Sequence, residues 1–148
     1  MTATPQRPYS VLITDDDRES RETLRDIVAP QGYRTLLASS GEEAIEIVEH
    51  EPVHVVLLDM YMPTLTGLET IRLVRQVNDL LPCILVTADA EPGLIRAALN
   101  AHAYSVIPKP VSKNVVLYTV VRALGRTYGP PGDPRAGAPP DRPNPAGP

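Results

Sequence analysis

The sequence predicts an α/β fold in which five parallel strands form one sheet with helices on both faces. Between residues 9 and 128, short segments rich in β-branched residues alternate with segments of helical period. Strict alternation is typical of parallel sheets, because each crossover helix packs back onto a face of the sheet. Residues 53–59 and 83–88 are almost continuously apolar, as parallel strands buried on both faces should be.

Five segments are expected to form the strands of this sheet. Each is short and combines β-branched with other apolar residues, which favours a strand over a helix. They are residues 9–14 (YSVLIT), 33–39 (YRTLLAS), 53–59 (VHVVLLD), 83–88 (CILVTA) and 104–108 (YSVIP).

The segments between and after the strands carry the apolar spacing of helices that pack on a sheet. In the last of them, the apolar residues from Leu117 to Leu124 follow an i, i+3, i+4, i+7 pattern. We expect helices at residues 18–29, 41–50, 67–78, 92–101 and 112–127.

Three of these helices have residues that suit a helix start. Ser40 and Glu43 have the spacing of a capping box, in which each side chain accepts the backbone N–H of the other residue. Pro92 suits the first helical position, because the backbone N–H that proline lacks would have no partner within the helix there. Ser112 suits the N-cap.

Composition and charge narrow the class of protein. The chain has 148 residues, 43% hydrophobic and 22% charged, which is typical of a globular domain with a core. The net charge of −4 argues against a domain that binds nucleic acid directly, because such domains are usually basic. The single cysteine, Cys83, indicates a reducing compartment. With no apolar leader and no long apolar run, we expect a cytoplasmic protein without a membrane segment.

The termini differ in composition from the rest of the chain. Residues 129–148 contain eight prolines and four glycines and cannot build a core, so we expect a disordered tail there. A proline-rich docking segment is the alternative. Residues 1–8 are expected to be an N-terminal extension and residues 9–128 a single domain. No output domain follows in this sequence, so the domain is expected to act alone.

Polar residues follow four of the five predicted strands. Residues 15–17 are all aspartate, Asp59 ends the third strand, Thr87 and Ala88 end the fourth, and Lys109 follows the fifth. Each feature alone could be a solvated loop or a surface charge. In open α/β sheets, however, ligands bind at the carboxyl ends of the strands, where these residues would converge.

This set of residues suits phosphoryl transfer. Neighbouring carboxylates raise one another's pKa values, and a hard cation such as Mg²⁺ relieves their repulsion. A carboxylate can attack phosphorus and form an aspartyl phosphate. The transferred group then needs positive charge and hydrogen-bond donors around its oxygens, which Lys109 and Thr87 could supply.

Four motifs resemble the receiver domain of two-component response regulators over about residues 9–128. They are VLITDDDRESRETL for the acidic loop, VVLLDMYMPTLTGLE for the phosphoacceptor loop, ILVTA for the switch-threonine strand and PKP for the lysine turn. The resemblance implies a flavodoxin-like receiver fold with strand order 2-1-3-4-5. It also implies a cis Lys109–Pro110 bond.

The resemblance also implies roles for individual residues. Asp59 would be the phosphoacceptor and a ligand of Mg²⁺, Asp16 would bind Mg²⁺ directly, and Asp15 would bind it through water. The carbonyl of Tyr61 would be the third protein ligand. Asp17 is expected to start the first helix instead.

Thr87, Lys109 and the backbone N–H of Ala88 would contact the phosphoryl oxygens. Pro63 and Gly67 would shape the turn after Asp59.

The function implied by the resemblance is a phosphorylation-activated signalling switch. A histidine kinase or phosphotransfer protein would donate the phosphoryl group, and an unidentified protein would receive the signal. The protein would not be an enzyme beyond self-phosphorylation and self-dephosphorylation.

One alternative function is a phosphate-independent interaction module. Another is an aspartate-nucleophile phosphohydrolase, which would need an acid where this sequence has Tyr61. A flavodoxin-like cofactor binder would need a phosphate loop where residues 15–17 are acidic.

The sequence departs from the family pattern on the fifth strand. Val106 stands where relatives carry an aromatic residue that takes part in switching, and His102 stands where glycine is frequent. Strand alternation predicts Tyr104 on the same face as Val106, but too far from Thr87 to replace it. We therefore expect the signal to leave through the loop 87–93 and the following helix.

Overall fold

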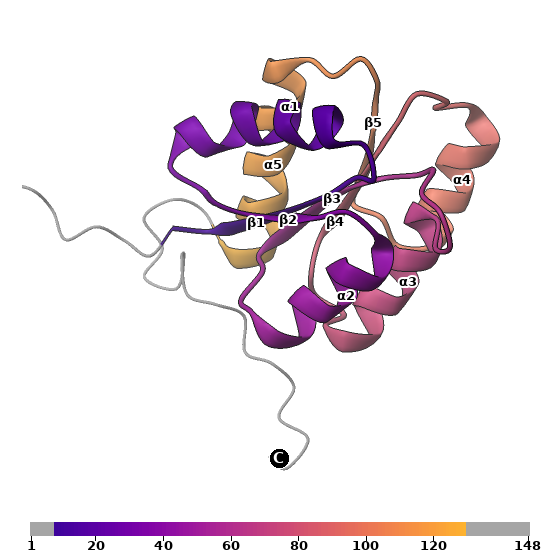
Figure 1. Cartoon of the computed structure of the whole chain (residues 1–148), viewed down its shortest axis with the longest axis horizontal. Coiled ribbons are helices and arrows are strands. Elements are labelled where there is room, and N and C mark those ends of the chain that lie inside the picture. The colour runs from indigo at the N-terminus through magenta and orange to yellow at the C-terminus, as the bar shows by residue number, and fades with distance from the viewer. Residues whose placement is uncertain (1–7, 130–148) are drawn as a thin grey trace, which may run out of the picture.

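The computed structural model describes residues 8–129 and has the predicted α/β architecture (Figure 1). Its strands are β1 (Ser10–Thr14), β2 (Arg34–Ala38), β3 (Val55–Asp59), β4 (Cys83–Thr87) and β5 (Ser105–Pro108). Its helices are α1 (Arg18–Val28), the short 3-10 helix η1 (Ala29–Gln31), α2 (Gly41–His50), α3 (Gly67–Val77), α4 (Pro92–Asn100) and α5 (Lys113–Tyr128). The expected tail, apart from its first residue, and most of the expected extension lie outside the described residues.

The sheet is parallel throughout and has the order β2-β1-β3-β4-β5, which confirms the predicted fold class. Helices α1 and α5 cover one face, and α2, α3 and α4 cover the other (Figure 1). Every residue of β1, β3 and β4 is buried. The three central strands therefore hold their carboxyl ends rigidly. Within residues 8–129, no helix combines the length and apolar character needed to cross a bilayer.

The helix starts agree with the sequence in all but one detail. The Asp17 carboxylate accepts the N–H of Ser20 at 2.9 Å, so Asp17 caps α1 as expected. The Ser40 hydroxyl accepts the N–H of Glu43, but the Glu43 carboxylate instead accepts the N–H and hydroxyl of Ser39. The capping box predicted there is thus only half formed, because Ser39 offers two donors one residue further back.

A complete capping box occurs instead at the start of α3. The Thr66 hydroxyl accepts the N–H of Glu69, and the Glu69 carboxylate accepts the N–H of Thr66. The Thr-x-x-Glu spacing was present in the sequence and could have predicted it. This box begins the helix that follows the loop after Asp59.

The structure corrects the prediction for Tyr104. Val106 packs on the α2–α4 side of the sheet, whereas Tyr104 packs on the α1–α5 side. Alternation does not extend to Tyr104, because it precedes Ser105, the first residue of β5. Hydrogen bonds that the Arg122 guanidinium on α5 makes to the side chains of Tyr104 and Tyr118 raise the pKa of Arg122. Tyr104 therefore lies on the opposite side of the sheet from Val106.

Replacing His102 with glycine is expected to raise the free energy of unfolding by about 0.5–1 kcal/mol. His102 follows α4 with φ of 65°, a conformation that disfavours residues with a Cβ atom. His50 is the last residue of helix α2, and its ring nitrogen Nδ1 lies 2.8 Å from the carbonyl oxygen of Glu46, so His50→Gly should instead lower stability. Urea denaturation of both variants measures the effect, and a destabilised His102→Gly protein would contradict this assignment of strain.

Candidate functional site

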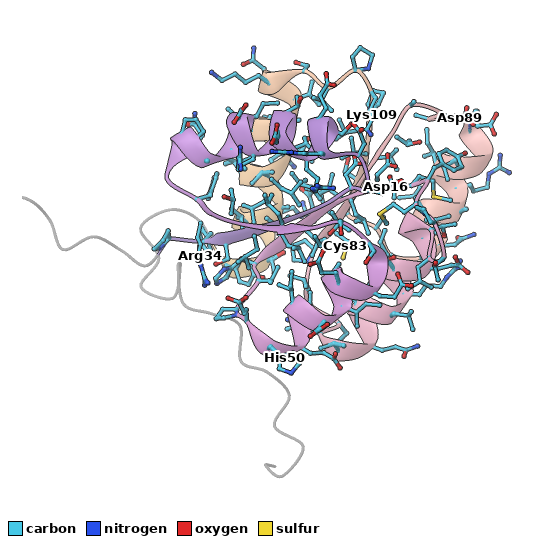
Figure 2. The ribbon with its side chains drawn as sticks, in the orientation of Figure 1. Asp16, Arg34, His50, Cys83, Asp89 and Lys109 are labelled. Atoms are coloured by element: carbon cyan, nitrogen blue, oxygen red, sulfur yellow. The ribbon has the colours of Figure 1, made fainter. Side chains whose placement is uncertain are left out.

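The predicted site residues gather at the carboxyl ends of β1, β3, β4 and β5. Asp15 and Asp16 follow β1, Asp59 is the last residue of β3, and Lys109 follows β5. Figure 2 shows Asp16 and Lys109 at this end of the sheet, with Arg34 at the other end. The parallel topology therefore brings together residues that are up to 94 positions apart in the sequence.

Three carboxylates form the floor of the site. Asp15, Asp16 and Asp59 each offer one oxygen, and these oxygens all lie within 4.8 Å of one another. Asp15 and Asp59 are buried, with 2% and 8% of their surface exposed, whereas Asp16 is exposed. Several hard oxygen donors at such short separation fit a divalent cation of the Mg²⁺ type, which binds through carboxylates and retains water.

The first acidic loop is fixed by hydrogen bonds as well as by β1. The N–H of Asp17 donates to Oδ1 of Asp15 at 2.9 Å. Arg21, one turn into α1, donates from Nη1 to the carbonyl of Asp15 at 2.7 Å. The start of α1 thus holds Asp15 beside Asp59, a role for Arg21 that sequence reasoning missed.

Lys109 joins two of the acids. Its Nζ lies 3.0 Å from Oδ2 of Asp15 and 2.9 Å from Oδ1 of Asp59. Burial lowers the pKa of Lys109, but hydrogen bonds to the two carboxylates outweigh burial, so that pKa lies above its ordinary value. The Lys109–Pro110 bond is cis, as the resemblance implied. Lys109 therefore carries a positive charge within the acid cluster at neutral pH.

The pKa of Asp59 lies above the ordinary aspartate value. Burial is the largest cause, and the charges of Asp15 and Asp16 add to it, whereas the hydrogen bond and charge of Lys109 act in the opposite direction. Loss of solvation and like charge together outweigh the single lysine. A cation bound to the cluster would reverse this balance and favour the ionised, nucleophilic form.

Thr87 and Ala88 lie beside Asp59 across the β3–β4 ladder. Asp59 pairs in register with Val86, which puts Thr87 one residue further toward the site. Thr87 is fully buried and Ala88 is exposed. The Thr87 hydroxyl oxygen accepts the N–H of Asp89 at 3.2 Å. Its own proton remains available for an acceptor such as a phosphoryl oxygen.

Tyr61 makes a contact that the sequence did not predict. The residue is 55% exposed, and its hydroxyl donates to Oδ2 of Asp89 at 3.3 Å. Slight desolvation, the charge of Asp89 and this hydrogen bond raise the pKa of Tyr61. Sequence reasoning named Tyr61 only for its carbonyl and did not name Asp89, because no local pattern relates residues 28 positions apart.

The turn after Asp59 has no room for a side chain at position 67, where the sequence has glycine. A Cβ atom there would lie 2.5 Å from the carbonyl oxygen of Asp59, 2.6 Å from Cδ1 of Leu85 and 2.9 Å from Cα of Met60. The N–H of Gly67 also donates to the carbonyl of Met60 at 2.8 Å. The start of α3 can therefore pack directly on the end of β3 only if this residue lacks a side chain.

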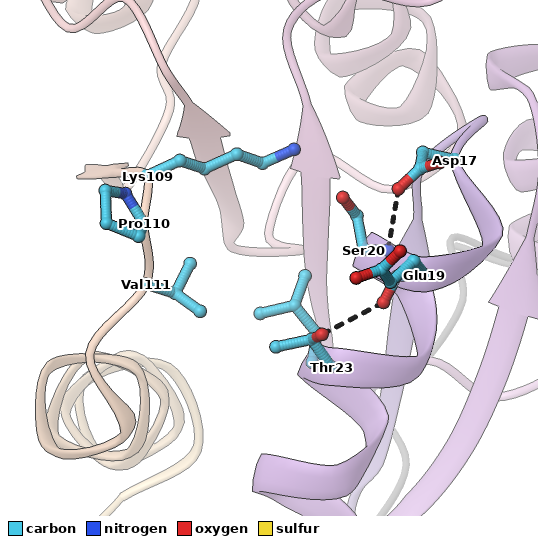
Figure 3. Close-up of a pocket in the computed structure, with 8 residues that line it drawn as sticks. Asp17, Glu19, Ser20, Thr23, Lys109, Pro110 and Val111 are labelled. Carbon is cyan, nitrogen blue, oxygen red and sulfur yellow. Dashed lines mark hydrogen bonds between the residues drawn. The ribbon is translucent and has the colours of Figure 1, made fainter.

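A cavity of about 400 Å³ opens next to Lys109 (Figure 3). It lies between the first turns of α1 and the loop that joins β5 to α5. Its lining residues are Asp17, Glu19, Ser20, Thr23, Leu24, Lys109, Pro110 and Val111. The cavity adjoins the acid cluster without containing Asp59, so it offers a surface beside the site and is not the reaction centre.

The fold and this arrangement of acids, lysine and threonine define a class of signalling protein. Residues 11–121 match the family described as "Response regulator receiver domain", and the chain belongs to that family. Members of this family are signalling switches of two-component systems and not classical enzymes.

Individual relatives agree with this assignment. The chain is 37% identical over 120 residues to the response regulator MprA of Mycolicibacterium vanbaalenii, covering 81% of this chain and 52% of that protein. It is 38% identical over 117 residues to MprA of Mycobacterium leprae, covering 79% and 51%. The chain thus spans about half the length of the curated relatives it matches.

Solved structures show the same fold. A CheY-like receiver domain protein from Methanospirillum hungatei has a TM-score of 0.77 at 26% identity, covering 81% of this chain and 96% of that one. The chemotaxis protein CheY4 of Vibrio cholerae has a TM-score of 0.76 at 25% identity, covering 79% and 99%.

Proposed function

We propose that Asp59 accepts a phosphoryl group in a Mg²⁺-dependent reaction and that the phosphorylated domain signals to a partner protein. The observation that carries the proposal is the contact of Lys109 with both Asp59 and Asp15, inside a cluster of three carboxylates. This combination supplies a nucleophile, donors for a divalent cation and a fixed positive charge at one place. Membership of the receiver family supports the same chemistry.

The phosphoryl group would come from a phosphohistidine of a histidine kinase or phosphotransfer protein. A carboxylate oxygen of Asp59 would attack phosphorus while the bond from phosphorus to the histidine nitrogen breaks, and the imidazole would leave with the bonding electrons. The cavity between α1 and the β5–α5 loop provides surface for such a donor beside Lys109.

The other residues would bind the transferred group. Lys109 would move its hydrogen bond from the carboxylate to a phosphoryl oxygen, and Thr87 and the N–H of Ala88 would donate to the remaining oxygens. Asp15, Asp16, Asp59 and the carbonyl of Tyr61 would hold Mg²⁺, which neutralises charge on the phosphoryl oxygens when bound.

Incubation with Mg²⁺ and phosphoramidate or acetyl phosphate is expected to add one phosphoryl mass to the full chain, measured by intact-mass spectrometry. Asp59→Asn and chelation of the metal should each abolish the addition. Asp17→Asn is the matched control, because Asp17 is an exposed acid next to the cluster and asparagine can still cap α1. Phosphorylation that survives Asp59→Asn would refute the assignment, and an unmodified wild-type chain would favour a phosphate-independent interaction module.

A further inference from the structure

Another cavity, of about 400 Å³, lies between β5 and α5, away from the acid cluster. Tyr104 and Ser105 line it at the amino end of β5, whereas Lys109 follows the carboxyl end of that strand. The four residues from Ser105 to Lys109 span about 13 Å of extended chain, so this cavity is separate from the proposed phosphorylation site. Its other lining residues are Tyr118, Thr119, Arg122 and Arg126, all from α5.

Every side chain that lines this cavity is polar, and none of them is acidic. Arg122 and Arg126 are four positions apart on α5, so they lie one turn apart on the same face of the helix. Neither arginine forms an ion pair with a carboxylate among residues 8–129. The cavity therefore holds two positive charges that have no counter-charge within the described part of the chain.

Neutral groups hold the Arg122 guanidinium in place. Its Nη1 donates to the Tyr118 hydroxyl at 3.2 Å, it also hydrogen-bonds the Tyr104 side chain, and its Cζ lies 5.6 Å from the centroid of the Tyr118 ring. These contacts orient the guanidinium without cancelling its charge. Because the Tyr118 hydroxyl accepts from Arg122, its own proton can be donated to another acceptor. The cavity thus offers donors that are ordered before an anion binds, which lowers the cost of binding.

The charges of the chain are distributed so that this region attracts a small anion. Residues 92–129 contain five lysines and arginines and no acid, whereas residues 1–91 contain sixteen acids and seven lysines and arginines. A second copy docked through the same region would bring like charges together. A long nucleic acid would bring its phosphates near the acidic remainder of the domain. A small anionic ligand avoids both kinds of repulsion.

We propose that this cavity binds a nucleoside monophosphate, with the phosphate on Arg122 and Arg126 and the base against the ring of Tyr118. A phosphate monoester carries a charge of about −1.5 to −2 at neutral pH, which matches two guanidinium groups, and its oxygens accept their paired N–H donors. Tyr118 is 63% exposed and leaves aromatic surface for a planar base. The cavity volume falls in the range of small-molecule sites, about 300–1,000 Å³. This site does not depend on phosphorylation of Asp59.

Titration of the ¹⁵N-labelled full chain with adenosine 5′-monophosphate (AMP), followed through amide chemical shifts, tests the site. Saturable shifts are expected at Tyr104, Ser105 and residues 118–126. Adenosine lacks the phosphate and inorganic phosphate lacks the base, so each should bind about tenfold or more weakly than AMP. Adenosine that binds as tightly as AMP would overturn the role of the arginines. Inorganic phosphate that binds as tightly as AMP would overturn the role of Tyr118.

Substitutions in the cavity separate the contacts to the phosphate from the contact to the base. Arg122→Gln and Arg126→Gln should each weaken AMP binding about tenfold or more, the effect of losing charged hydrogen bonds to the phosphate. Arg122→Lys keeps the charge but not the planar pair of donors, so it should recover only part of the affinity. Tyr118→Leu should weaken AMP binding more than Tyr118→Phe, because only phenylalanine retains an aromatic ring for the base.

Arg96→Gln is the matched control, because Arg96 is exposed on α4 and removes the same charge from residues 92–129 without lining the cavity. Its affinity for AMP should stay within about twofold of wild type, since only a distant and screened charge is lost. Equal losses in Arg96→Gln and Arg122→Gln would show attraction by the general positive field and would overturn the site. Absence of saturable shifts at the cavity residues in millimolar AMP would overturn it as well.

Discussion

Replacing Lys109 with methionine is expected to lower the free energy of unfolding by about 2–4 kcal/mol at pH 7 without metal. The lysine is the positive charge that contacts both Asp15 and Asp59, whose side chains are 2% and 10% exposed. Without it, two buried carboxylates lose their counter-charge. The expected loss is somewhat below that of a fully buried pair, because the Lys109 side chain is 24% exposed.

The loss should depend on pH with a defined sign. Without Lys109, burial and the charges of Asp15 and Asp16 raise the pKa of Asp59 further above its value in the unfolded chain, about 3.9. At pH values between the unfolded and the folded pKa of Asp59, the folded variant binds more protons than the unfolded chain. Its free energy of unfolding therefore falls as pH rises through this range. The deficit of the variant should therefore be small near pH ~4 and largest at neutral pH.

The contribution of Lys109 itself follows from its raised pKa. Its stabilising effect in wild type is fully present below the ordinary lysine pKa of about 10.4 and is lost only as pH rises through the folded value. Urea denaturation at several pH values measures both effects.

Added Mg²⁺ and a control variant distinguish the loss of the lysine's positive charge from a general packing defect. Added Mg²⁺ should restore part of the stability of Lys109→Met, because a divalent cation can neutralise the same carboxylates. Lys113 is exposed at the start of α5, and Lys113→Met should change stability by less than about 0.5 kcal/mol. A Lys109→Met deficit that is independent of both pH and Mg²⁺ would show that the lysine acts through packing alone.

Replacing Gly67 with alanine is expected to lower the free energy of unfolding by about 3 kcal/mol or more. The added methyl group would meet the carbonyl oxygen of Asp59 at 2.5 Å and Cα of Met60 at 2.9 Å. Both are backbone atoms at the end of a buried strand, so they cannot yield by a side-chain rotation. Relief would require moving α3 away from β3, which would also displace Asp59.

Gly93 provides the matched control for this substitution. No atom lies within 4 Å of a Cβ built on Gly93, which is in the first turn of α4. Gly93→Ala should therefore leave stability unchanged or raise it by up to about 1 kcal/mol through helix propensity. Denaturation curves of the two variants give the comparison. A Gly67→Ala protein within about 1 kcal/mol of wild type would mean that the turn has room to relax.

The sequence by itself determined the fold class and the location of the site. Alternating strand and helix periods require a parallel sheet, and parallel strands present their carboxyl ends at one edge. This was enough to expect Asp15, Asp16, Asp59 and Lys109 close together, as the structure places them. These inferences succeeded because burial patterns are local and repeat with the period of each element.

Only the tertiary structure decided which side chains meet across loops. The contact of Tyr61 with Asp89 depends on how two loops face each other, and no periodicity encodes it. Tyr104 left the expected face because it lies just before β5, where strand alternation does not apply. The sequence showed that a glycine follows Asp59 in a turn, but the need for Gly67 arises from atoms of β3 and β4 that pack against it. Such contacts are set by the close packing of segments distant in sequence, which local patterns do not report.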